Sequence, residues 1–369
     1  MLIDIIAGAR PNFMKIAPII RALELRSNSG GPLQYRLVHT GQHYDLSMSG
    51  TFFEQLNIPE PDVNLNIGGG TQAEQAAGIM IAYEKLLINA PCSLCLVVGD
   101  VTSSMACAIT AQKLRIPVAH VEAGIRSGDW NMPEEINRIV TDSITNWFFT
   151  TSEWAGSNLR KSGVKESQIF FVGNTMIDTL LANIHKLKPP SFWEHYHLEP
   201  GAYFVVTMHR PANVDSAQAL AEMLQAIGRE TRRLPVVFPV HPRTAKTLRD
   251  LVDLPKNFIL AKPQPYLQFN YLVKHAKAVI TDSGGITEET TVMGIPCLTL
   301  RNNTERPETI EQGTNELIGT NSAALRPALE RVFNGTWKKG ITPHLWDGKA
   351  GERIIDEIEN LLIRKVAES

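Results

Sequence analysis

Three carboxylates stand where the ends of buried strands would bring polar chemistry together. Asp100 and Glu122 each follow a short apolar run, with Gly99 directly before Asp100 and Gly124 two residues after Glu122. Glu134 comes soon afterwards and opens the next helical pattern. Because open α/β sheets bind ligands at the carboxyl ends of their strands, we interpret residues 97–138 as the centre of a functional site.

The second half of the chain carries a pattern suited to a diphosphate. Ser283, Gly284 and Gly285 stand at a predicted helix start, where a hydroxyl, bare backbone N–H groups and the helix dipole would meet an anion. Glu289, a turn further on, could accept hydrogen bonds from a ribose, and Arg306 could neutralise phosphate. The alternative is a glycine turn with solvated acids. The glycine pair favours a ligand, since it permits close backbone approach.

Other polar residues also follow predicted strands. His209 comes at the end of the first strand of the second half, and His241 at the end of the next. Arg10 and Lys15 follow a strand and a glycine turn, a layout that binds phosphate but also serves as an ordinary turn into a helix. Gln42 belongs to a polar run after the second strand, for which a simple surface loop is the alternative.

Apolar runs alternate with helical patterns along the whole chain, which predicts an α/β fold with parallel sheets. The alternation restarts after a loose, proline-containing connection, so we expect two Rossmann-like doubly wound domains facing each other across a cleft. Strands are predicted at 2–7, 35–40, 95–98, 117–121, 147–150, 169–172, 203–207, 236–240, 258–260, 278–281 and 296–300. The main helices are predicted at 72–89, 134–145, 153–162, 216–232, 267–275, 286–293, 321–333 and 351–365.

The composition is that of a globular enzyme and argues against several other classes. The 369 residues include 36 Lys and Arg against 38 Asp and Glu, a formal net charge of -2 that gives no basic footprint for nucleic acid. No apolar run could span a bilayer, and the N-terminus lacks a basic signal-peptide start, so we expect a cytoplasmic protein without membrane insertion. Cys92 and Cys95 form a single C-x-x-C, which we interpret as structural thiols rather than a zinc or redox site.

These residues together predict a ligand with two unlike parts. The second half would hold its diphosphate, and the other end would reach the carboxylates of the first half. Sugar-nucleotide transfer, epimerisation and hydrolysis all fit this arrangement. No cluster has metal-ligand spacing, and the G-x-S-x-G elbow of serine hydrolases is absent from the sequence.

The motifs as a set resemble the non-hydrolysing UDP-N-acetylglucosamine 2-epimerases. The matching motifs are Gly8-Ala9-Arg10-Pro11 with Lys15, Gly41-Gln42-His43, Gly99-Asp100, His120-Val121-Glu122-Ala123-Gly124, Pro133-Glu134-Glu135-x-Asn137-Arg138, Gly173-Asn174-Thr175, His209-Arg210, Asp282-Ser283-Gly284-Gly285 and Thr304-Glu305-Arg306-Pro307. The resemblance implies a fold like that of the GT-B glycosyltransferases. Residues 1–175 plus 352–369 would form the sugar-side domain, and residues 176–351 the UDP-binding domain.

The resemblance also implies the reaction, its partners and its residues. UDP-GlcNAc would be converted reversibly to UDP-ManNAc through elimination of UDP to 2-acetamidoglucal, without NAD, metal or other cofactor, in a homodimer. Asp100, Glu122 and Glu134 match the family's catalytic carboxylates, with acid and base left unassigned, and His209 matches the histidine that assists UDP departure. Substrate and UDP contacts would come from Arg10, Lys15, Gln42, His241, Phe269, Ser283, Gly284, Gly285, Glu289 and Arg306.

Two departures from the family pattern bear on the substrate. Tyr44 and Asp45 replace the residues that allosterically activated members carry after Gln-His, which leaves activation by UDP-GlcNAc open. The loop 126–132 is short and resembles that of enzymes acting on UDP-2,3-diacetamido-2,3-dideoxyglucuronate. The alternatives are therefore a 2-epimerase of that sugar, a hydrolysing relative that releases ManNAc and UDP, and a fold that only binds a sugar nucleotide.

Overall fold

The computed structural model describes residues 1–8, 10–41, 55–249 and 253–368. Its internal contacts divide the chain into two compact units. Unit 1 comprises Met1–Ala182 and His344–Ser369, and unit 2 comprises Asn183–Pro343. Both limits differ by several residues from those expected at 175 and 352. The reason is that α7 (Thr175–Asn183), except for its last residue, and Trp346 belong to unit 1, where the Trp346 indole donates a 2.9 Å hydrogen bond to the Thr151 carbonyl.

The described part of unit 1 contains a seven-stranded parallel sheet in the order β3-β2-β1-β4-β5-β6-β7. The strand order reverses between β1 and β4, which is the switch point where doubly wound sheets bind ligands. The strands are β1 (Leu2–Ala7), β2 (Gln34–His39), β3 (Val63–Asn64), β4 (Leu94–Val98), β5 (Val118–Val121), β6 (Trp147–Thr150) and β7 (Ile169–Phe171).

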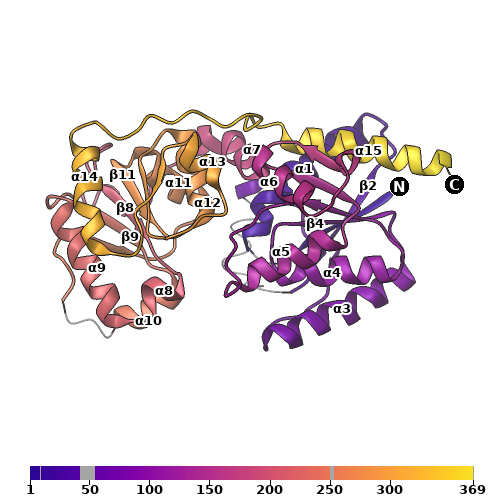
Figure 1. Ribbon diagram of the computed structural model, residues 1–369, viewed down its shortest axis with the longest axis horizontal. Coiled ribbons are helices and arrows are strands. Elements are labelled where there is room, and N and C mark those ends of the chain that lie inside the picture. The colour runs from indigo at the N-terminus through magenta and orange to yellow at the C-terminus, as the bar shows by residue number, and fades with distance from the viewer. Residues whose placement is uncertain (9, 42–54, 250–252, 369) are drawn as a thin grey trace. The chain divides into compact units, whose positions relative to one another are not determined.

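Helices cover both faces of this sheet (Figure 1). Side chains of β4 and β5 pack with those of α3 and α4 in a core that includes Tyr83, Val97 and Cys107. At the start of α3, Thr71 is the N-cap, and its side chain and that of Glu74 cap the helix reciprocally. The helices are α1 (Arg10–Asn28), α3 (Gln72–Asn89), α4 (Thr102–Lys113), α5 (Pro133–Ser143), α6 (Glu153–Lys161), α7, and α15 (Ala350–Glu368), with short 3-10 turns at Glu166–Gln168 and Ile184–Lys186.

The last helix returns to unit 1 and lies against α1 (Figure 1). Its second residue is Gly351, and a Cβ there would lie 2.6 Å from the Pro18 carbonyl, so only glycine allows this approach. The Gly351 N–H donates a 2.7 Å hydrogen bond to the buried Asp178 carboxylate. Burial raises the pKa of Asp178 to about 6, and backbone N–H groups at the start of α15 oppose this shift.

Unit 2 repeats the same architecture with a six-stranded parallel sheet among its described residues, in the order β10-β9-β8-β11-β12-β13. Its switch point lies between β8 and β11, with Thr207 opposite Thr281. The strands are β8 (Phe204–Thr207), β9 (Val236–Pro239), β10 (Phe258–Ala261), β11 (Ala278–Thr281), β12 (Cys297–Thr299) and β13 (Asn315–Leu317). The helices are α8 (Pro211–Val214), α9 (Ala217–Glu230), α10 (Pro242–Leu248), α11 (Tyr266–His275), α12 (Gly284–Met293), α13 (Pro307–Glu311) and α14 (Leu325–Phe333), with a 3-10 turn at Ser322–Ala324.

Two parallel sheets with helices on their faces confirm the expected α/β class. All four cysteines are buried thiols without disulfides. Within the part of the chain that the structure describes, none of the helices has the length and apolar character needed to cross a membrane.

Candidate active site

The side chain of Asn12 links the ends of β1 and β4 at the switch point of unit 1. The Asn12 side chain accepts a 3.3 Å hydrogen bond from the Gly8 N–H and donates a 2.8 Å bond to the Val98 carbonyl. This joins the turn after β1 to the end of β4. Arg10 begins α1, but its side chain lies outside the described part of the structure, as does the whole of Gln42.

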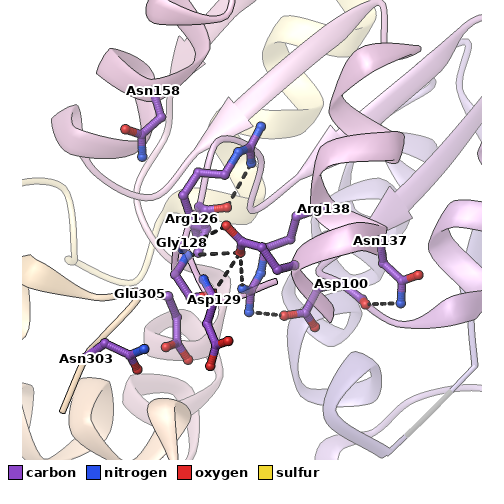
Figure 2. A network of polar contacts seen from close by, with 12 residues as sticks. Asp100, Arg126, Gly128, Asp129, Asn137, Arg138, Asn158, Asn303 and Glu305 are labelled. Carbon is purple, nitrogen blue, oxygen red and sulfur yellow. Dashed lines mark hydrogen bonds and ion pairs between the residues drawn. The ribbon is translucent and has the colours of Figure 1, made fainter. Parts of the chain in front are cut away.

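Asp100 follows β4 and is held by α5 (Figure 2). The guanidinium of Arg138 donates a 2.5 Å hydrogen bond to its carboxylate, and the Asn137 amide donates a 2.9 Å bond to its backbone carbonyl. The Asp100 side chain keeps about a quarter of its surface exposed, at 27%, whereas Arg138 is buried. A buried arginine thus orients a carboxylate that remains partly exposed.

Glu122 follows β5, the neighbour of β4, and Val98 lies opposite Val121 in the register of these strands. The buried Glu122 carboxylate pairs with the ammonium of Lys15, which comes from α1. The φ angle of Glu122 is 72°, a left-handed conformation that costs energy for a residue with a Cβ and is concentrated at functional sites. Asp100 and Glu122 therefore stand at the ends of adjacent strands, as expected.

Glu134 is exposed in the first turn of α5, four residues before Arg138 and so on the same helical face. Its neighbour Glu135 is buried and accepts hydrogen bonds from the backbone N–H groups of Ser127 and Gly128, both at 2.9 Å. Burial alone would raise the pKa of Glu135, but these bonds and Arg138 lower it. Glu135 thus fastens the loop 126–132 to the start of α5.

At the switch point of unit 2, His209 is paired with a buried aspartate. Its Nδ1 lies 2.8 Å from Oδ1 of Asp282, which is fully buried, while the His209 ring is 41% exposed. Burial would raise the pKa of Asp282, but hydrogen bonds from His209, Arg210 and Asn213 hold it below its usual value. An ionised aspartate at Nδ1 fixes the ring tautomer, so Nε2 is the atom available for chemistry.

The glycine pair of unit 2 forms the first two residues of α12, two residues earlier than the predicted start at 286, with Ser283 as the N-cap. The backbone there is partly exposed and packs closely on its neighbours, since a Cβ on Gly284 would lie 2.5 Å from Oε1 of Glu305. Arg301 donates a 2.6 Å hydrogen bond to that same glutamate. Helix N-termini favour anions, and Ser283–Gly285 begin this helix beside the ion pair of Arg301 and Glu305.

Glu289 is buried in α12 and accepts hydrogen bonds from the Tyr266 hydroxyl at 2.9 Å and the Asn270 amide at 3.2 Å. Burial raises its pKa to about 7, and the two hydrogen bonds limit the rise. Any ribose contact would have to share this carboxylate with two protein donors.

We expect Glu289→Gln to change how stability depends on pH. The folded pKa lies above the ordinary value, so the native carboxyl binds a proton that the unfolded chain releases, and wild type loses stability as pH rises through 7. Glutamine does not titrate, so the variant should gain up to about 3 kcal/mol relative to wild type between pH 4.5 and 8. Urea unfolding across this pH range measures the free energy of unfolding of both proteins. If the two free energies depended on pH in the same way, the raised pKa of Glu289 would be contradicted.

The remaining expected binding residues are placed in unit 2. The ring of His241 lies 5.6 Å from that of His209, so these two histidines are neighbours. Phe269 is partly buried on α11, against the core cluster that contains Leu272. Arg306 is buried and contacts Glu288 at 2.7 Å, so its charge is already partly neutralised by protein. Among the residues that the structure describes, no group of three or more His, Cys, Asp or Glu side chains could hold a metal ion.

Arg138 and Asp282 were not among the predicted site residues. Both stand inside motifs that carry the family resemblance, Pro133-Glu134-Glu135-x-Asn137-Arg138 and Asp282-Ser283-Gly284-Gly285. A charged residue within a motif that also contains a predicted site residue is the signal that could have drawn attention to them.

Doubly wound parallel sheets with polar side chains gathered at each switch point define a protein of two Rossmann-like units. The sequence matches the family model described as UDP-N-acetylglucosamine 2-epimerase over residues 24–359. The chain belongs to this family.

Individual proteins with similar sequences support this family membership. UDP-N-acetylglucosamine 2-epimerase from Methanocaldococcus jannaschii is 41% identical over 96% of this chain and 98% of that protein. A crystal structure of the M. jannaschii enzyme with UDP-GlcNAc and UDP has a TM-score of 0.88 at 40% identity, over 98% of this chain and 100% of that one. UDP-2,3-diacetamido-2,3-dideoxy-D-glucuronate 2-epimerase from Pseudomonas aeruginosa is 36% identical over 86% of this chain and 88% of that protein. The calicheamicin glycosyltransferase CalG4 shares the fold alone, with a TM-score of 0.55 at 15% identity over 98% of each chain.

Proposed function

We propose that this chain interconverts UDP-GlcNAc and UDP-ManNAc by inverting the configuration at C2, without net hydrolysis. Family membership supports the reaction class. The observation that carries the proposal is the adjacency of Asp100 and Glu122 at the ends of paired strands β4 and β5, each beside a cationic side chain. Two carboxyl groups at one site can act on the two faces of a sugar ring.

The reaction needs elimination because the proton at C2 of the sugar is not acidic. As the C1–O bond breaks, its electron pair leaves with UDP and positive charge grows at C1. A carboxylate then takes the C2 proton, and its C–H electron pair forms the C1–C2 double bond of 2-acetamidoglucal. A second carboxyl group delivers a proton to the opposite face of C2 while UDP adds back at C1. Asp100, Glu122 and Glu134 are the groups we assign to proton transfer and charge stabilisation.

The side chains of unit 2 would hold the UDP part. We assign the diphosphate to the N-terminus of α12 at Ser283, Gly284 and Gly285, where helix dipole and N–H groups favour an anion. His209, oriented by Asp282, would donate a hydrogen bond to the departing diphosphate. The further contacts we propose are from Arg10, Lys15, Gln42, His241, Phe269, Glu289 and Arg306.

The loop 126–132 favours a second candidate substrate beside UDP-GlcNAc. Arg126 is held in this loop by a 2.6 Å hydrogen bond to the buried Asp142, and a cation there suits a carboxylated sugar. The Pseudomonas relative named for UDP-2,3-diacetamido-2,3-dideoxy-D-glucuronate points the same way. The second candidate is therefore 2-epimerisation of that sugar nucleotide.

Product analysis separates these candidates. The purified protein is incubated in parallel with UDP-GlcNAc and UDP-2,3-diacetamido-2,3-dideoxyglucuronate, and the anomeric protons are followed by NMR. We expect UDP-GlcNAc to reach a mixture with UDP-ManNAc and to release little free sugar. Turnover of the glucuronate alone would transfer the proposal to the second substrate. Stoichiometric ManNAc and UDP would identify a hydrolase, and no turnover of either compound would refute both candidates.

A further inference from the structure

A buried histidine lies directly beneath the two strand ends that carry Asp100 and Glu122. His120 is on β5, two residues before Glu122, and only 1% of its surface is exposed. Its Nδ1 lies 2.7 Å from Oδ1 of Asp142, and its Nε2 lies 2.9 Å from the carbonyl oxygen of Gly99. The elimination chemistry above does not use this residue.

Both neighbours of the His120 ring are hydrogen-bond acceptors. A backbone carbonyl such as that of Gly99 can only accept, so Nε2 must carry the proton of that bond. Asp142 is ionised, because its contacts with His120 and Arg126 lower its pKa although burial opposes this. Its carboxylate is also only an acceptor. Both contacts are hydrogen bonds when the ring presents an N–H to each of these two oxygens.

These bonds connect the two turns that bear the carboxylates. The Gly99 carbonyl belongs to the peptide bond that leads into Asp100, and the Gly99 N–H donates a 3.0 Å bond to Val121 on β5. On the other side, Oδ2 of Asp142 accepts a 3.1 Å bond from the Gly124 N–H, two residues after Glu122. His120 and Asp142 thus form a brace from the Gly99–Asp100 turn to the Glu122–Gly124 turn.

We propose that His120 is a positioning residue for epimerisation, which sets the direction of Asp100 relative to Glu122 by holding the Gly99 carbonyl. The inference rests on the proposed function, since it assigns both carboxylates to proton transfer. Small errors in the placement of reacting groups are costly, so loss of the Gly99 contact should lower turnover by about tenfold to a hundredfold.

Two amide substitutions separate positioning from simple packing. The glutamine amide of His120→Gln extends as far as ring Nε2 and can still donate to the Gly99 carbonyl. The shorter amide of His120→Asn reaches only the Nδ1 position and can serve Asp142 alone. Asp4→Asn is the matched control: Asp4 is equally buried, pairs with Arg36 at 2.8 Å, and lies in the amino-terminal half of β1.

Turnover and hydrogen–deuterium exchange of peptides covering 94–105 are measured for all four proteins. We expect His120→Asn to lose about tenfold or more in kcat with KM nearly unchanged, and to exchange faster around residues 99–101. His120→Gln should retain most of the kcat and the slow exchange, and Asp4→Asn should lower only stability. Equal effects of Gln and Asn, or unchanged kcat in both, would overturn the proposal. If wild type turns over neither sugar nucleotide, the proposed function fails, and the exchange rates alone decide whether His120 braces the turn.

Discussion

Replacing Glu122 with glutamine is expected to lower kcat about a thousandfold while UDP affinity stays within about twofold. The amide has nearly the same shape as the carboxylate and can still accept a hydrogen bond from Lys15, but it cannot take up a proton. UDP affinity should persist because the contacts that we assign to UDP lie mainly on other residues. Initial rates and UDP titrations measure the two effects.

The same experiment extended to Asp100→Asn tests how the proton-transfer roles are divided. In an elimination and re-addition route, the base for one epimer is the acid for the other. A variant lacking one of the two groups should therefore exchange the C2 proton of one sugar nucleotide faster than that of its epimer. Glu122→Gln and Asp100→Asn should show opposite preferences. Glu84→Gln, at an exposed position on α3, is the control. The same preference in both variants would contradict the assignment of one carboxylate to each face.

The second large effect is expected from the His209 and Asp282 pair. His209→Asn should keep UDP binding and lose about a hundredfold or more in kcat, because the departing diphosphate loses its hydrogen-bond donor. Asp282→Asn should also lower kcat strongly, since the ring then loses the carboxylate that fixes its tautomer.

Because these two residues act as one unit, their effects should not add. Asp282→Asn introduced into the His209→Asn protein should cost less than about threefold more in kcat, measured by single-turnover kinetics. His185→Asn, at an exposed position, serves as the control. Fully additive losses would show that Asp282 acts on catalysis by a route other than His209.

Several of the apolar strands inside the two sheets were predictable from the sequence. The strands at Leu2–Ala7, Trp147–Thr150 and Ala278–Thr281 have the expected bounds, because each is an apolar run that ends abruptly. The edge strands Val63–Asn64 and Asn315–Leu317 were missed, since two or three residues carry no pattern and depend on a neighbour for pairing.

Helix starts were harder to predict. We expected α12 to begin at residue 286 because glycine usually marks a turn, yet the structure begins it at Gly284. There Ser283 forms the N-cap, and the close contact of Gly284 with Glu305 leaves no room for a Cβ. The expected helix at 321–333 divides into a 3-10 turn and α14.

For the site, strand ends located Asp100, Glu122 and His209, because a polar residue after an apolar run is visible in the sequence. Which residue pairs with each of them could not be read from the sequence. Arg138 reaches Asp100 from 38 residues away through the placement of α5, and Asp282 reaches His209 through the pairing of β8 with β11. Such contacts depend on sheet order and register, which periodicity does not encode.

The most direct test of the central claim is the fate of the C2 hydrogen when UDP-GlcNAc is turned over in D2O. Elimination removes that hydrogen to a carboxylate, and re-addition takes a new proton from a group that exchanges with solvent. We predict that the recovered UDP-ManNAc carries deuterium at C2, seen by NMR as loss of the H2 signal and of its coupling to H1. UDP-ManNAc that retains its original hydrogen at C2, or a protein that exchanges neither sugar nucleotide, would contradict the proposed function.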